Sequence, residues 1–63
     1  MTQEQMIYRV QQAEHLIGRY AQLERERERA GLYEEALEAR RLRLENEASV
    51  IYWRSRASED EAA

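Results

Sequence analysis

The residues best suited to metal binding or acid–base catalysis are the single histidine, His15, and the glutamates of the two halves of the chain. Carboxylate-bridged di-metal bundles carry a Glu-x-x-His spacing on their helices. Neither Glu14 nor Glu38 has that spacing to His15, and the chain has no cysteine. The sequence therefore predicts no metal site and no cofactor, with His15 as an ordinary polar position of a helix.

Three serines in the second half of the chain, Ser49, Ser55 and Ser58, are the candidate nucleophiles. Nucleophilic catalysis needs a base beside the hydroxyl and a third group that orients the base. No such set accompanies these serines, and a chain of 63 residues has little room for a concave pocket. We therefore predict no catalytic residues and no enzymatic activity.

Arginine and aromatic residues gather near the end of the chain, at Tyr52, Trp53, Arg54 and Arg56. These residue types dominate the binding energy of protein interfaces. They also stack on the bases of single-stranded RNA. The pattern predicts a contact surface for a partner at these four residues, and we favour a protein partner. The alternative for Trp53 is that it fills the open end of a helical bundle.

Charge argues against a nucleic-acid partner. The net charge is −3, and residues 1–31 carry five arginines and five glutamates, so the body of the molecule is near neutral. A second basic cluster is interleaved with glutamates that repel phosphate: Arg40, Arg41 and Arg43 among Glu38, Glu45 and Glu47. The predicted function is a non-enzymatic helical interaction protein that docks on protein, such as a small regulator or assembly factor.

The alternative function is an RNA- or DNA-binding helical-hairpin dimer. Repressor-of-primer proteins, which regulate plasmid copy number, are helical hairpins of similar length that dimerise and bind RNA. This chain is similar to them in expected architecture only, because their core and RNA-contacting residues do not align with it.

Two helices must position these residues. The chain has no proline, and Gly31 stands at its midpoint. Thr2 and Gln5 have the spacing of a capping box, which starts a helix, and a glycine favours the left-handed conformation that ends one. We therefore predict helices at about 3–29 and 32–57, with a turn at Gly31.

Apolar residues recur at helical spacing in both halves. The first predicted helix carries Met6, Val10, Ala13, Ile17 and Tyr20 on one face, and the second carries Tyr33, Leu37, Leu44, Ala48 and Ile51. A weaker stripe of the second helix holds Leu32, Ala39, Leu42, Val50 and Trp53. Folding at Gly31 would oppose Ile17 to Leu44 and Val10 to Ile51. The pattern predicts an all-α antiparallel hairpin over residues 1–57, joined through the Leu37–Leu44–Ile51 seam.

A hairpin of this size does not bury enough apolar surface to be stable alone. We expect it to dimerise into a four-helix bundle. The predicted core of the bundle consists of Val10, Ile17, Tyr20, Leu37, Leu44 and Ile51. The alternative fold is one long helix, unbroken through Gly31, in a coiled coil. Residues 58–63 are acidic, small and aperiodic, so we expect a disordered tail.

Composition also bears on origin and location. All ten basic residues are arginine, which codon bias in a GC-rich genome explains and which fits a phage or bacterial source. The longest apolar run is only Val50–Trp53, too short to cross a membrane or to serve as a signal peptide. We expect a cytoplasmic protein without membrane contact.

Overall fold

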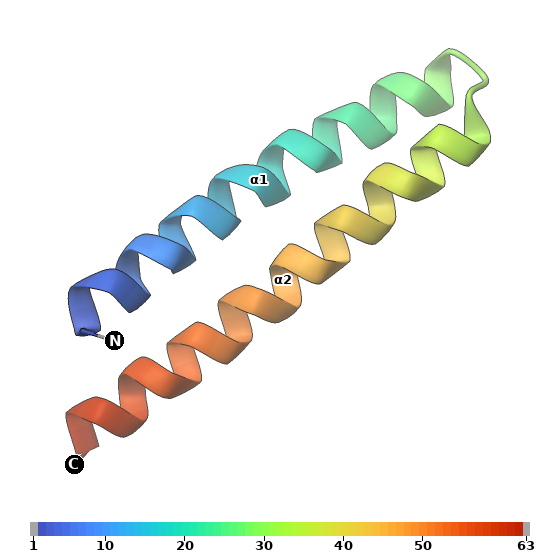
Figure 1. Cartoon of the computed structure of the whole chain (residues 1–63). Helices are drawn as coiled ribbons and strands as arrows, with labels where there is room; N and C mark the ends of the chain where they lie inside the picture. The colour runs from blue at the N-terminus through green and yellow to red at the C-terminus, as the bar shows by residue number, and fades with distance from the viewer. Residues whose placement is uncertain (1, 63) are drawn as a thin grey trace.

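A computed structural model of the protein describes residues 2–62, with the side chains of residues 2–59. It contains two helices, α1 (Gln3–Arg29) and α2 (Tyr33–Ala62), and no strand among the described residues. The helices run antiparallel and side by side (Figure 1). The predicted all-α helical hairpin is confirmed, and the alternative of one unbroken helix through Gly31 is wrong.

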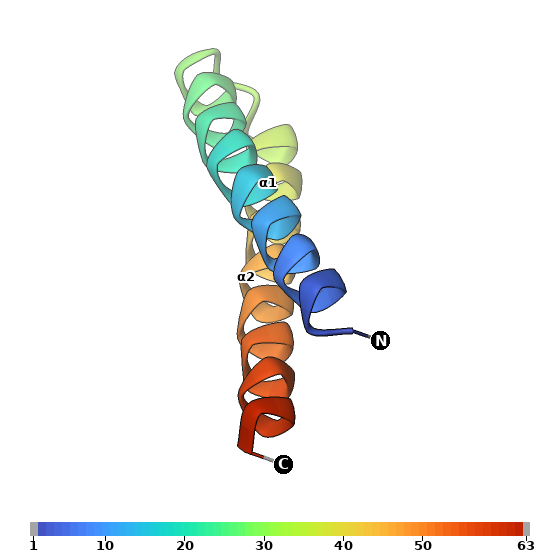
Figure 2. The same cartoon turned by 90° about the vertical axis from the view of Figure 1, so that its left-hand side faces the viewer.

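The hairpin is a thin rod. Its Cα atoms span 49 Å along the long axis and 13 Å in each of the other two directions. The two helices cross at a shallow angle, and α2 extends past the start of α1 (Figure 2). In the described part of the chain, neither helix has an apolar stretch long enough to cross a bilayer.

A capping box begins α1, as the spacing of Thr2 and Gln5 predicted. The backbone N–H of Gln5 donates to Thr2 Oγ1 at 3.2 Å, and the backbone N–H of Thr2 donates to Gln5 Oε1 at 2.9 Å. Two N–H groups that lack a partner at a helix start are thereby satisfied. The first helix therefore begins where the sequence predicted.

Gly31 ends α1 with the backbone conformation that glycine adopts most easily. Its φ is +78°, and its N–H donates to the Glu28 carbonyl at 3.1 Å. The N–H of Leu32 donates to the Arg27 carbonyl at 2.8 Å. These two bonds form a Schellman motif, which satisfies carbonyl groups at the end of the helix and reverses the chain.

The second helix is longer than the sequence predicted. It continues to Ala62, whereas we predicted an end at 57 and disorder over 58–63. No glycine or proline follows Gly31, and alanine and glutamate favour helix, so no local signal stops α2 at 57. Residue 63 lies outside the described part of the chain.

One stripe from each helix makes the contact between them, and we call this contact the hairpin seam. Its members recur at steps of three and four residues, and every one is buried or half-buried. They are Met6, Val10, Ala13, Ile17, Tyr20, Glu24 and Arg27 on α1, and Ala36, Ala39, Arg43, Asn46, Val50, Trp53 and Ala57 on α2. The core is thin, because only five hydrophobic side chains within residues 2–59 are buried and three of these are alanines.

The predicted face of α2 is wrong. Leu37, Leu44 and Ile51 do not face α1, since they are 62%, 47% and 71% exposed. The stripe judged weaker packs instead, through Ala39, Val50 and Trp53 among others. The short turn at Gly31 holds the helices close together, so only small side chains fit between them there. Ala36 and Ala39 meet that need, and they are 3% and 0% exposed.

The axial alignment of the helices is close to the predicted one even though the face is not. Arg9 lies over the ring of Trp53, and Arg27 Nη1 donates to the Glu35 carbonyl at 3.1 Å, and both contacts join residues equally distant from Gly31. The contacts of Arg43 with Glu24 and of Arg54 with Glu14 join residues whose distances from Gly31 differ by five and six positions.

Candidate functional site

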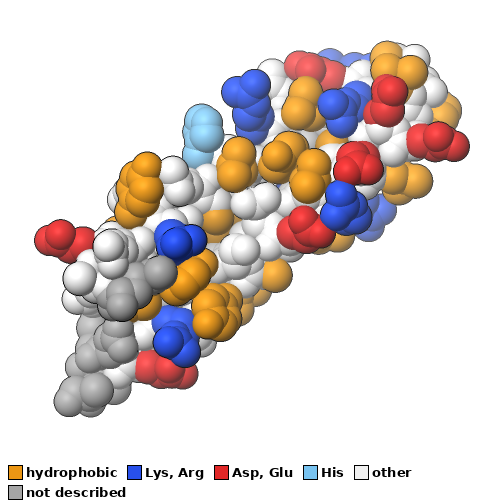
Figure 3. All heavy atoms as spheres, in the orientation of Figure 1, with side chains coloured by type: hydrophobic (Ala, Val, Ile, Leu, Met, Phe, Trp, Pro, Cys, Tyr) orange, Lys and Arg blue, Asp and Glu red, His pale blue; other side chains and the backbone are white. Residues whose placement is uncertain are grey.

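The outward face of α2 carries the largest set of exposed apolar side chains in one row. We call Tyr33, Leu37, Leu44 and Ile51 the outer stripe, and their exposed fractions are 68%, 62%, 47% and 71%. Leu37, Leu44 and Ile51 are seven residues apart, so they lie on one side of the helix. Hydrophobic side chains also reach the surface between arginine and glutamate side chains in Figure 3. The outer stripe is the leading candidate for a contact surface.

The part of α1 beside the outer stripe is mostly polar. One hollow near the turn is lined by Glu24 and Glu28 of α1 together with Tyr33, Leu37 and Arg40 of α2. A second hollow, near the open end, is lined by α1 residues that include Ile7, Gln11 and Glu14, and by Arg54 and Ala57 of α2. Met6 and Val10 of α1 also line the second hollow, but they are buried or half-buried, so Ile7 is the large apolar side chain of α1 that is exposed there.

A charged group interrupts the hairpin seam. Arg43 donates to Glu24 Oε1 from Nε at 3.4 Å and from Nη2 at 3.3 Å, and to Glu47 Oε1 from Nη1 at 3.1 Å. The side chains of Arg43 and Glu24 are 24% and 18% exposed. Desolvation lowers the pKa of Arg43, but the hydrogen bonds and charges of Glu24 and Glu47 outweigh it and raise the pKa. Arg43 is therefore a charged member of the seam.

Arg41 lies on the exposed side of α2 between two glutamates. It donates to Glu38 and to Glu45, each at 2.7 Å. The hydrogen bond to Glu38 and the negative charges of Glu38 and Glu45 raise the pKa of Arg41. Two arginines of the predicted basic cluster, Arg41 and Arg43, are thus neutralised by glutamates of the same chain.

The predicted partner-binding residues form an aromatic cluster at the open end of the hairpin. The rings of Tyr52 and Trp53 meet edge to face, with centroids 5.0 Å apart. The Arg9 guanidinium lies 5.1 Å from the centre of the Trp53 ring, and that of Arg56 lies 5.9 Å from the Tyr52 ring. Trp53 is half-buried, whereas Tyr52 is 53% exposed. The structure therefore places Trp53 in the hairpin seam and Tyr52 on the surface.

Arg54 points to α1 rather than to solvent alone. Its Nη2 donates to Glu14 Oε1, and this ion pair links the two helices in the half of the hairpin away from the turn. Spacing alone did not predict a role for Glu14, Glu24 or Arg9 in the contact between the helices. Glu24 does have a signal in the sequence, because the three-and-four spacing places it in line with Met6, Val10, Ala13, Ile17 and Tyr20. Arg9 and Glu14 lie outside that spacing.

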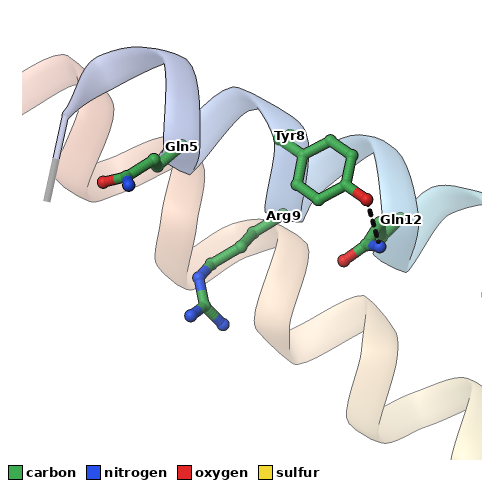
Figure 4. A pocket seen from close by; sticks show the side chains of 4 residues that line it. All are labelled: Gln5, Tyr8, Arg9 and Gln12. Carbon is green, nitrogen blue, oxygen red and sulfur yellow. Dashed lines mark hydrogen bonds between the residues drawn. The ribbon is translucent and has the colours of Figure 1, made fainter.

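A shallow hollow on α1, beside the aromatic cluster, is lined by Gln5, Tyr8, Arg9 and Gln12 (Figure 4). Gln12 Nε2 donates to the Tyr8 hydroxyl at 2.8 Å, while Arg9 reaches from α1 towards α2. The hollow holds no acid and no histidine that could act with the hydroxyl. It offers hydrogen-bonding groups but no set of groups for a reaction.

His15 and the three candidate serines lie on different helices. His15 is exposed on α1, and Ser49 donates its hydroxyl hydrogen to the Glu45 carbonyl at 3.2 Å. In the region that the structure describes, no three His, Asp or Glu side chains are grouped closely enough to hold a metal ion.

No protein-family model matches this sequence, and neither a curated protein nor a solved structure is similar to it at a significant level.

Proposed function

We propose that this protein is a non-enzymatic interaction protein that docks on a protein surface, a second copy of itself included, through the outer stripe of α2. In this proposal the hairpin acts as a small regulator or assembly factor, with a phage or bacterial origin as the arginine-only usage suggests. Its stable form is an oligomer of hairpins, the simplest being a dimer built as a four-helix bundle.

The observation that carries the proposal is the outer stripe itself. Burying a leucine or isoleucine side chain contributes about 1.5–3 kcal/mol relative to leaving it exposed. Leu37, Leu44 and Ile51 obtain little of this stabilisation within one hairpin, because roughly half or more of each is exposed. Burial of these three side chains by a partner would therefore stabilise the complex relative to the isolated hairpin.

The thin core supports the same proposal. The buried hydrophobic residues are Met6, Ala13, Ala36, Ala39 and Val50, and no large side chain in the described region is fully buried. The chain contains no cysteine, so no disulfide compensates for this core. Association is the remaining way to bury more apolar surface.

The ion pairs of the arginines favour a protein partner over a nucleic acid. Arg41, Arg43 and Arg54 each pair with at least one glutamate of the same chain. A phosphate backbone would have to displace these glutamates or bind beside them, and like charges repel. We therefore keep the nucleic-acid alternative only as an outcome of the experiment.

The experiment is affinity capture from a host lysate with tagged wild-type protein, with Leu44→Glu, and with His15→Glu as the matched control. Both variants add one exposed acid, but only Leu44 lies in the outer stripe. We expect the wild type and His15→Glu to recover the same proteins, and Leu44→Glu to lose them. Equal recovery by all three would contradict docking through the outer stripe.

A nuclease treatment of the same lysate separates the two classes of partner. Recovery that survives nuclease and changes little between about 50 and 200 mM salt supports protein docking. Recovery that nuclease abolishes, or that falls by orders of magnitude over this salt range, would support nucleic-acid binding instead.

A further inference from the structure

We propose that a second copy of this chain covers the outer stripe, with the two α2 helices antiparallel and the two-fold axis beside Leu44. This proposal rests on the proposed function and specifies one occupant and one alignment for the same surface. Three observations support it: the position of the apolar side chains, the order of the charges and the polarity of α1.

The spacing of the stripe is symmetric about its middle residue. Leu37 lies seven residues before Leu44, and Ile51 lies seven residues after it. Seven helical residues span about 10.5 Å, so antiparallel alignment on Leu44 sets Leu37 of one copy opposite Ile51 of the other. The same alignment sets Leu44 opposite Leu44. A two-fold interface requires this kind of self-complementary surface.

The charges beside the stripe distinguish this alignment from a parallel one. Arg40 and Glu47 flank the stripe on one side of α2, and Arg41 and Glu45 flank it on the other side. In the antiparallel alignment each flank meets the same flank of the other copy, so Arg40 lies within one residue of the level of Glu47, and Arg41 within two residues of the level of Glu45. In a parallel, in-register alignment each flank meets the opposite flank, which sets Arg40 beside Arg41 and Glu47 beside Glu45. Opposite charges across an interface favour the first arrangement, and like charges disfavour the second.

Arg40 is exposed and makes no ion pair within the residues that the structure describes. Its side chain is therefore free to pair with Glu47 of a second copy. Glu47 would then be shared between this arginine and Arg43 of its own chain.

Helix α1 is unsuited to the centre of this interface. Beside the outer stripe it presents Gln11, Glu14, Glu24 and Glu28, with only Ile7 as a large exposed apolar side chain. Contact between the two α2 helices buries apolar surface, whereas contact through α1 would desolvate carboxylates. The two α1 helices therefore lie on the outside of the proposed dimer, where their charged side chains stay in water.

Cysteine cross-linking tests the alignment directly, because the natural chain has no cysteine. The full-length variants are Leu37→Cys, Leu44→Cys and Ile51→Cys, with His15→Cys as a control on an exposed face of α1. Disulfides form only where the Cα atoms come within about 7 Å. Of the four variants tested singly, we expect only Leu44→Cys to form a disulfide-linked dimer under mild oxidation. Leu37→Cys and Ile51→Cys should cross-link only when they are mixed with each other.

Light scattering across micromolar concentrations accompanies the cross-linking. We expect a dimer for the wild type, and at least about a tenfold weaker dimer for Leu44→Glu, because the axis would bring two glutamates together. Far-ultraviolet circular dichroism reports whether each variant is still helical.

Each other outcome overturns the proposal in a distinct way. A dimer in which Leu37→Cys cross-links by itself indicates parallel helices and leaves the proposed function intact. A monomer that loses captured proteins in Leu44→Glu indicates that another protein, not a second copy, covers the stripe. A monomer whose captured proteins do not change with Leu44→Glu contradicts both this proposal and the proposed function.

Discussion

Glu24 of α1 accepts two hydrogen bonds from Arg43 of α2, inside a seam that is otherwise made mostly of apolar and small side chains. The two residues are nineteen positions apart in the chain, and both side chains are less than one quarter exposed. Such a pair loses much of its hydration on folding, which opposes the attraction of the two charges. It contributes to the specific alignment of the helices more clearly than to their stability.

This relationship gives the first prediction, a double-mutant cycle between Glu24→Leu and Arg43→Leu. Each single variant leaves one charge in the seam without its partner across the helices, so each should unfold at lower urea than the wild type. The double variant removes both charges and should unfold at the wild-type midpoint or above it. Urea unfolding at fixed protein concentration measures the effect. Independent losses that simply add in the double variant would show that the pair is not coupled.

The second prediction concerns the two glycines. Gly31 has a φ of +78°, a conformation that costs other residues about 1–2 kcal/mol, so Gly31→Ala should lower the free energy of unfolding by about that amount. Gly18 lies inside α1, and a Cβ atom added there has open space around it. Gly18→Ala should therefore stabilise the protein by about 0.5–1 kcal/mol. Chemical unfolding compares these matched variants, and stabilisation by both would contradict the role given to Gly31.

The third prediction tests the start of α1. Thr2→Ala removes the hydroxyl that accepts from the Gln5 N–H and should cost about 1 kcal/mol of stability. Thr2→Ser keeps that acceptor and should stay within a few tenths of a kcal/mol of the wild type. Hydrogen exchange of the amides in the first turn of α1 provides the measurement. Equal protection in Thr2→Ala and Thr2→Ser would mean that the capping box contributes little in solution.

Local signals made much of this fold predictable from the sequence. The capping box of Thr2 and Gln5 and the left-handed Gly31 depend on neighbouring residues only, so they fixed the start and end of α1. Helical spacing of apolar residues then indicated two helices of similar length. Each of these features depends on interactions between residues that are close in sequence, and for that reason a sequence pattern can predict it.

The face of α2 depends instead on contacts between distant residues. Large apolar side chains at seven-residue spacing predicted a seam at Leu37, Leu44 and Ile51. The stripe that packs in the structure contains Arg43 and Asn46, which such a pattern disfavours. The charge of Arg43 is tolerated in the seam because Glu24 meets it from the other helix. Asn46 satisfies its amide locally, by donating to the Leu42 carbonyl at 2.8 Å. Neither compensation is visible in the spacing of apolar residues.

The last prediction decides between two roles for Trp53. The sequence predicted that Trp53, with Tyr52, Arg54 and Arg56, binds a partner. In the structure Trp53 is half-buried in the hairpin seam, and the Arg9 guanidinium covers its ring at 5.1 Å. Truncating a fully buried tryptophan costs about 3–5 kcal/mol, so Trp53→Ala should lower the stability of this half-buried site by roughly 2 kcal/mol. Tyr52→Ala, at a position 53% exposed, should cost less than half as much.

Circular dichroism must follow this unfolding, because Trp53 is the only tryptophan and its removal abolishes the usual fluorescence signal. The comparison is made at one protein concentration, since association shifts apparent stability. A large loss of stability for Trp53→Ala with a small one for Tyr52→Ala identifies Trp53 as a seam residue. Unchanged stability of Trp53→Ala, together with loss of captured proteins, would instead support the partner-binding role, because the indole would then contribute to binding and not to folding.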